Sequence, residues 1–209
     1  MYHLLGLYDS PYVRRVAITL TCYDISFTHE SLSVFRHVDA MRPKNPLLRV
    51  PQLTAPDGAL YYESALILDY LDELARQRGI SALVAAAGAE RHAVWQAMAI
   101  AQAATDKAVA IVYEFRRPET QRWDDWLTRV RDQLRTAFGL LEAQLAENGG
   151  EWLVGERMSH ADVMAAVAVG FIRYTLPDEW PAGEWRHVEA LAARLETTPA
   201  FLAVPIDTE

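Results

Sequence analysis

The sequence predicts an α/β first domain followed by an all-helical second domain. The first 78 residues contain two kinds of pattern: short apolar or alternating runs, which predict strands, and stretches with apolar residues at helical spacing, which predict helices. They follow one another in the order βαβ and then ββα. After residue 88 only helical spacing continues. We therefore expect a mixed four-stranded sheet with its helices over 1–78, an alanine-rich linker over 79–88 and helices over 89–209.

The elements of the first domain follow from these patterns in order. Residues 3–8 form an apolar run typical of a buried strand, and apolar residues then recur from Val13 to Leu20 at helical spacing. Residues 25–32 alternate as a half-exposed strand does, and 35–44 is polar, which predicts a loop or a short helix. Strands are predicted over 50–54 and 59–62 around a Pro-Asp-Gly turn, and a helix over 65–76.

The second domain is predicted as long helices with distinct end signals. The expected helices cover residues 90–115, 123–147, 160–174 and 188–196. Before the third of these, Ser159 and Asp162 match a capping box in which Asp replaces the usual Glu or Gln at the third helical position.

Composition narrows the class of partner. The formal net charge is −8, which repels nucleic acid and anionic membrane surfaces, and no apolar run reaches membrane-spanning length. The single cysteine, Cys22, excludes an internal disulfide or a CxxC metal pair, and the histidines and carboxylates show no metal-ligand spacing. We expect a cytoplasmic protein that uses no metal and spans no membrane.

The join between the first strand and the first helix carries one hydroxyl. Ser10 precedes Pro11, which suits the first position of a helix. The Ser10 side chain can cap that helix, or it can point outward as a donor where the helix end, Arg14 and Arg15 favour an anion. These residues alone leave both interpretations open.

Two further features fall where strands meet helices. A cis Val50–Pro51 bond would turn main-chain polar groups outward to a peptide-like ligand. Glu63 and Ser64 open a helix, where amides and a hydroxyl can hold a carboxylate while Glu63 pairs with an ammonium group. An α-amino acid carries both of these groups, although each residue alone is equally compatible with a structural role.

In combination, these motifs resemble those of the cytosolic glutathione transferases, and most closely the bacterial members with a serine-type active site. The resemblance covers essentially the whole chain. It is carried by residues 10–16 (SPYVRRV), 45–53 (NPLLRVPQL), 62–65 (YESA) and 153–162 (LVGERMSHAD). It implies a thioredoxin-like first domain, glutathione as co-substrate, a homodimer and a role in detoxification.

The resemblance also implies roles for single residues. Ser10 would donate a hydrogen bond to the glutathione sulfur, and Val50, beside Pro51, would pair its main chain with the cysteinyl unit. Glu63 and Ser64 would hold the γ-glutamyl end. Arg49 would reach the glycyl carboxylate. Arg36 and His37 are further candidates for this contact, although a solvated loop is the simpler interpretation for both.

The implied chemistry is attack of the bound thiolate on a small hydrophobic electrophile. A glutathione-dependent isomerase or dehalogenase would use the same thiolate, and a non-catalytic binding or regulatory protein would use only the fold. Serine at position 10 disfavours thiol–disulfide exchange, and Cys22 is expected to be a buried structural thiol. Tyr12 is the alternative donor to the sulfur.

The electrophile is expected to bind between the domains, near the first long helix of the second domain. The side chains considered for this lining are Trp95, Met98, Gln102, Asp106 and Tyr113. An apolar stripe of this kind is more often core or subunit interface, so no single contact is assigned.

Overall fold

The computed structural model describes residues 1–206 and divides the chain into two compact units. The first unit comprises Met1–Leu83 together with the chain from Thr197 onward, and the second comprises Val84–Glu196. The sequence had placed all residues after 88 in the helical domain, so the last segment differs from that expectation. Residues 79–88 form neither helix nor strand, as predicted.

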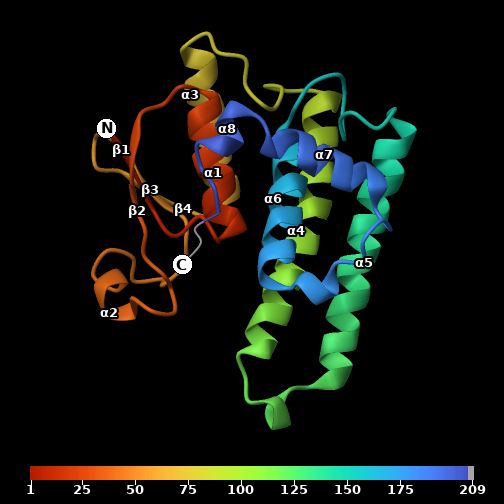
Figure 1. Ribbon diagram of the computed structural model, residues 1–209. Helices are drawn as coiled ribbons and strands as arrows, with labels where there is room; N and C mark the ends of the chain where they lie inside the picture. Colours follow the sequence, from red (N-terminus) through yellow and green to blue (C-terminus); the bar gives the residue numbers. More distant parts are fainter. Residues whose placement is uncertain (207–209) are drawn as a thin grey trace. The chain divides into compact units, whose positions relative to one another are not determined.

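The first unit is built on a mixed four-stranded sheet, which confirms the predicted class (Figure 1). Its strands are β1 (Tyr2–Leu5), β2 (Phe27–Glu30), β3 (Gln52–Thr54) and β4 (Leu60–Tyr62), in the order β2-β1-β3-β4. β1 pairs parallel with β2, whereas β3 runs antiparallel to both β1 and β4. Leu4 and Leu53 are directly opposed and fully buried at the centre of the sheet.

Two predicted helices complete the βαβ–ββα order, and a third, short helix lies in the segment 35–44 that was expected to be a loop or a short helix. They are α1 (Pro11–Cys22), the short α2 (Val38–Met41) and α3 (Ser64–Gln77). α1 and α3 lie side by side (Figure 1). Their buried residues, such as Val16 and Leu71, recur at helical spacing and form the apolar core against the sheet.

The sequence patterns did not predict the return of the chain to the first unit. α8 (Pro199–Leu202) packs against α1. Arg14, which is only 2% exposed, donates from Nε to the Val204 carbonyl at 3.0 Å, and its guanidinium lies 5.5 Å from the centre of the Phe201 ring. A buried charge needs partners of this kind, so Arg14 ties residues 201–204 to α1.

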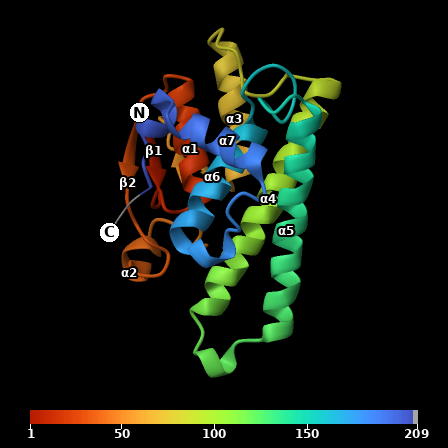
Figure 2. The same cartoon turned by 45° about the vertical axis from the view of Figure 1, so that its right-hand side comes forward.

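The second unit is the predicted helical bundle (Figure 2). Its long helices are α4 (Ala89–Phe115), α5 (Asp124–Glu147), α6 (His160–Thr175) and α7 (Arg186–Glu196), with short 3-10 turns η1 (Glu119–Gln121) and η2 (Pro177–Glu179). α4 and α5 form a long antiparallel pair, and α6 packs against both α4 and α7. Within residues 1–206, no helix combines the length and apolar character needed to cross a bilayer.

The predicted capping box at the start of α6 is confirmed. The carboxylate of Asp162, itself fully buried, accepts from the Ser159 amide at 2.8 Å and from the Ser159 hydroxyl at 2.7 Å. Its other oxygen accepts from the Leu153 amide at 2.8 Å. Asp162 therefore fixes both the helix start and the loop that precedes it.

Candidate functional site in the sheet-containing unit

Ser10 is the N-cap residue of α1, but its side chain makes no hydrogen bond to the backbone amides at the helix end. Its backbone is extended, with φ −72° and ψ 119°, and its carbonyl accepts the first helical bond from the Arg14 amide at 2.9 Å. The hydroxyl makes no capping hydrogen bond and is half-buried. The capping interpretation is therefore wrong for Ser10, and its hydroxyl lies at the positive end of a helix of twelve residues.

Val50 lies at the same end of the sheet, against the residues that lead to Ser10. The Val50–Pro51 peptide bond is cis, as predicted. Gly6, with φ +129°, directly follows β1, and a Cβ at this position would lie 2.6 Å from Val13 Cγ2 and 2.8 Å from Val50 Cβ. Because no side chain fits there, glycine lets Val50 pack close to the first turn of α1.

The segment before Val50 is fixed by a buried amide side chain. Asn45 is fully buried, donates from Nδ2 to the Arg49 carbonyl at 2.5 Å and accepts at Oδ1 from the Leu47 amide at 3.0 Å. Both polar ends of this side chain are thus used within one turn. The turn sets the position of the backbone that enters Val50.

Glu63 and Ser64 form the start of α3. Glu63 is the N-cap, with φ +70° and ψ 116°, a conformation that L-residues other than Asn and Asp seldom adopt outside functional sites. The first helical bond runs from the Ile67 amide to the Glu63 carbonyl at 3.1 Å, so the Ser64 amide precedes it and points out of the helix end. This arrangement suits a carboxylate ligand.

Arg15 links the start of α3 to α1. Its guanidinium is completely buried, and Nη2 donates to Ser64 Oγ at 2.5 Å. Ser64 Oγ in turn donates to Glu63 Oε1 at 3.3 Å. Because a buried cation and a buried hydroxyl both require partners, this chain of bonds connects the Glu63 side chain through Ser64 to Arg15 of α1.

Comparisons with known proteins identify the family of the chain. The family model described as "Glutathione S-transferase, N-terminal domain" matches residues 4–79, and the model described as "Glutathione S-transferase, C-terminal domain" matches residues 124–194. The chain belongs to the glutathione S-transferase family. The two models between them match both units of this transferase-family chain.

Three relatives illustrate the likeness. A glutathione transferase family member from Pseudomonas fluorescens Pf-5, solved with bound glutathione, is 28% identical with a TM-score of 0.85, and all of each chain is covered. A glutathione S-transferase from Methylobacterium radiotolerans, solved with glutathione sulfonate, is 26% identical with a TM-score of 0.87, covering 100% of this chain and 96% of that one. The uncharacterized GST-like protein YibF of Escherichia coli is 26% identical over 82% of each chain.

Arg49 is the most exposed of the predicted glutathione contacts in this family member. Its Nη2 lies 3.7 Å from Glu63 Oε2, and the two side chains are 79% and 51% exposed. An ion pair this exposed contributes little to stability, on the order of 0–1 kcal/mol. The structure thus brings Arg49 next to Glu63, although the two residues come from different elements.

The sequence patterns did not predict the contacts that three site residues make. Gly6 and Asn45 set the backbone around Ser10 and Val50, and Arg15 was expected only to add positive charge near Ser10. A helical arginine is normally solvated, and nothing in its spacing shows that it is buried. Asn45 could have been suspected because it opens the matched segment 45–53.

Cys22 and the tyrosines that flank Ser10 lie in surroundings that differ from those of Ser10. Cys22 is half-buried rather than fully buried, and desolvation raises the pKa of its thiol to about 11, so the thiol is protonated near neutral pH. Tyr8 stacks on His29, with ring centres 3.9 Å apart, and the Tyr12 ring lies 5.7 Å from the Arg15 guanidinium carbon. Across the described residues, no group of three or more His, Cys, Asp or Glu side chains is arranged to hold a metal ion.

The residues considered for the electrophile site differ in their surroundings. Met98 is buried in the helical unit, and Trp95 and Gln102 are half-buried. Asp106 and Tyr113 are exposed. Met98 therefore belongs to the core, and the part played by the other four stays a prediction.

Proposed function

We propose that this protein conjugates glutathione to small hydrophobic electrophiles, with Ser10 as the donor that stabilises the bound thiolate. The observation that carries the proposal is the Ser10 hydroxyl, which makes no capping bond although it occupies the capping position of α1. Val50 and the Glu63–Ser64 helix start belong to the same unit. Relatives solved with glutathione or glutathione sulfonate support the choice of ligand.

In the proposed complex each end of glutathione has a partner. The sulfur accepts a hydrogen bond from Ser10, and the cysteinyl main chain pairs with Val50 beside Pro51. The γ-glutamyl carboxylate accepts from the Ser64 amide and from the Ser64 hydroxyl, which turns from Glu63 Oε1 to the ligand, and the ammonium group pairs with Glu63. Arg49 binds the glycyl carboxylate.

The chemical consequence is a larger thiolate fraction. A thiol of pKa about 8.5 is only a few per cent ionised at neutral pH, and a donor hydroxyl at a helix N-terminus lowers such a pKa by roughly one to three units. The thiolate forms a bond from sulfur to the electrophilic carbon, and the leaving group departs with the bonding electrons. Holding both reactants supplies further acceleration.

Retention on immobilised glutathione, followed by a conjugation assay with a chromogenic aryl halide, tests the proposal. Retention with turnover supports it. Turnover only with substrates that isomerise, or with haloalkanes that lose halide without leaving a stable glutathione conjugate, would assign an isomerase or dehalogenase that uses the same thiolate. Retention without turnover over a panel of electrophiles would make the protein a glutathione-binding or regulatory protein.

Two further expectations belong to this proposal. We propose a homodimer, which light scattering tests by the mass in solution. We also propose a cytoplasmic location and a role in detoxification, which fractionation and the sensitivity of a deletion strain to electrophiles test.

A further inference from the structure

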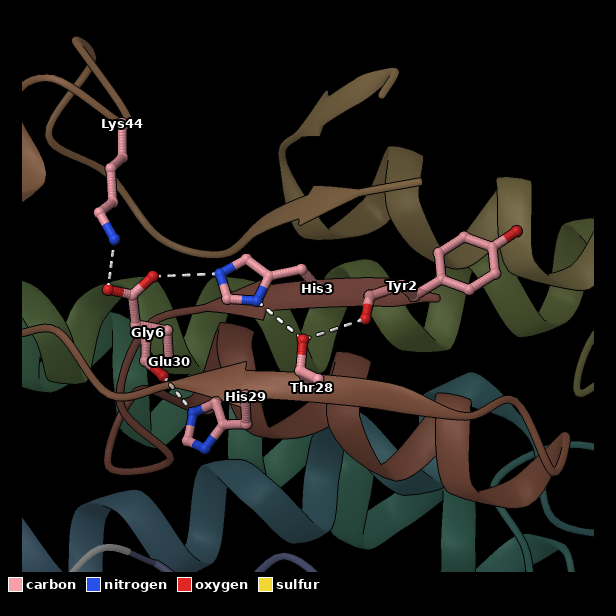
Figure 3. A network of polar contacts seen from close by, with 7 residues as sticks. All are labelled: Tyr2, His3, Gly6, Thr28, His29, Glu30 and Lys44. Atoms are coloured by element: carbon pink, nitrogen blue, oxygen red, sulfur yellow. Dashed lines mark hydrogen bonds and ion pairs between the residues drawn. The ribbon is translucent and has the colours of Figure 1, made fainter. Parts of the chain in front are cut away.

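The last two residues of β2 reach toward opposite sides of the sheet. Side chains alternate along a strand, so His29 and Glu30 point away from each other, as Figure 3 shows. Each contacts a different segment of the first unit. One segment leads to Ser10, and the other leads to Arg49 and Val50.

His29 holds the start of the Ser10 loop. Its Nε2 lies 2.6 Å from the Gly6 carbonyl oxygen, and because a carbonyl only accepts, Nε2 carries the proton (Figure 3). The Gly6 amide donates to the Glu30 carbonyl at 3.0 Å. The His29 ring also lies parallel to Tyr8, with an interplanar angle of 3°. Both polar groups of Gly6 and the ring two residues later are therefore held by the end of β2.

Glu30 holds the other segment through Lys44. Its carboxylate accepts from Lys44 Nζ at 2.5 Å and contacts His3 Nε2 at 3.1 Å (Figure 3). The bond from Lys44, followed by that from His3, keeps the pKa of Glu30 below its ordinary value even though partial burial opposes this. Lys44 directly precedes Asn45, whose amide binds the Arg49 carbonyl.

We propose that His29 and Glu30 are positioning residues for the glutathione site, each for one of its two segments. His29 fixes the loop that presents the Ser10 hydroxyl to the sulfur. Glu30, through Lys44, fixes the segment that presents Arg49 and Val50 to the rest of the tripeptide. This inference rests on the proposed function, and it adds that the side chains of two neighbouring residues on one strand each hold one of the two segments.

A first experiment measures amide hydrogen exchange in the protein without glutathione. His29→Phe keeps an aromatic ring for Tyr8 but loses the donor to Gly6, whereas His29→Gln keeps an N–H at a similar reach. We expect exchange of the Gly6 and Ser10 amides to rise about two- to tenfold in the first variant and to stay near wild type in the second, since one hydrogen bond is lost only in the first. His92→Gln, at an exposed histidine, is the matched control.

The same measurement examines the second segment. Lys44→Met keeps the aliphatic stem and loses the ion pair, and we expect faster exchange at Leu47 and Leu48 with Gly6 and Ser10 unchanged. Lys107→Met, at the only other lysine of the chain, is the control. Variants that lower thermal stability without these local changes, or that change both segments alike, would overturn the proposal.

A second experiment tests whether the two segments act on different kinetic parameters. The Ser10 segment is expected to change kcat and the thiol pKa, and the Arg49–Val50 segment is expected to change KM for glutathione. His29→Phe is expected to lower kcat about three- to thirtyfold and to raise the pKa of the bound thiol, with rescue in His29→Gln. Lys44→Met and Glu30→Gln are expected to raise KM for glutathione about two- to fivefold, in the range of an exposed ion pair, with the thiol pKa unchanged. If the residues had a purely structural role, the thiol pKa would stay unchanged in all variants, and kcat and KM would not respond separately to the two sets of substitutions.

The outcomes separate this inference from the proposed function. If the wild-type protein does not bind glutathione, the proposed function itself is overturned. Wild-type protein that binds and turns over glutathione, with all variants equal to it, overturns only the assignment of His29 and Glu30.

Discussion

Two helices of this protein begin with a serine at the capping position, and the two serines have different surroundings. Ser159 at the start of α6 bonds Asp162 with both its amide and its hydroxyl. Ser10 at the start of α1 makes no capping bond with its side chain. The first serine completes the structure of its own helix, whereas the second leaves a donor at a helix end.

The third helical residue accounts for the difference. Asp162 occupies that place in α6 and supplies acceptors, while Val13 occupies it in α1 and packs against the position of Gly6. A serine followed three residues later by a carboxylate is thus a cap, and a serine followed by Pro and then an apolar residue is a candidate for ligand contact. The comparison predicts that one serine governs activity and the other stability.

Ser10→Ala should have the largest effect on activity. We expect turnover to fall about ten- to a thousandfold, because one donor to a resident anion is lost. The free energy of unfolding should change by less than about 0.5 kcal/mol, since the variant breaks no capping bond. Steady-state kinetics and urea unfolding measure the two quantities. A large stability loss with unchanged turnover would make Ser10 equivalent to Ser159.

Cys22 lies at the C-terminal end of α1, and its thiol is expected to behave differently from the glutathione thiol at the N-terminal end of the same helix. With its pKa raised by burial from 9.0 to about 11, its thiolate fraction below pH 9 is about a hundredfold smaller than in the unfolded chain. Labelling by iodoacetamide, followed by mass spectrometry, should therefore be about a hundredfold slower in the folded protein and should accelerate tenfold per pH unit up to about pH 11. Rapid labelling at pH 7 would show that the chain carries a reactive thiol of its own.

Asp162→Ala should have the largest effect on stability. The change leaves the buried amides of Leu153 and Ser159 without an acceptor, so we expect a loss of about 3 kcal/mol, or about 10 °C in Tm. Ser159→Ala is the milder companion, at about 1 kcal/mol. Calorimetry measures both. Turnover per folded molecule should stay within about twofold of wild type. A larger loss of activity in fully folded protein would contradict the assignment of stability to the start of α6 and of activity to the start of α1.

Tyr12→Phe should have the smallest effect. The ring lies beside the Arg15 guanidinium, and phenylalanine keeps that contact. We expect turnover within about twofold of wild type, measured by the same conjugation assay. A loss as large as that of Ser10→Ala would transfer the role of sulfur donor to the Tyr12 hydroxyl.

The sequence predicted the order of elements because their patterns are local. Helical spacing located α4 and α5 to within one or two residues, and Ser159 with Asp162 marked the start of α6. The resemblance carried by short segments such as 10–16 and 45–53 pointed to the family that the comparisons show.

The features that escaped prediction depend on contacts between distant parts of the chain. Arg14 and Arg15 are adjacent in one helix, yet one binds the Val204 carbonyl and the other Ser64 Oγ. No local pattern specifies such partners, so α8 and the link from α1 to α3 emerged only from the structure. For the same reason, whether Ser10 caps its helix could not be decided from its neighbours alone.

The most direct measurement is the titration of the glutathione thiol in complex with wild-type protein and with Ser10→Ala, followed by the ultraviolet absorbance of the thiolate. We predict that the bound thiol in wild type has a pKa roughly one to three units below that of a free thiol, which is about 8.5, and that the value in Ser10→Ala returns toward that of the free thiol. Equal pKa values in the two complexes would contradict the role of Ser10.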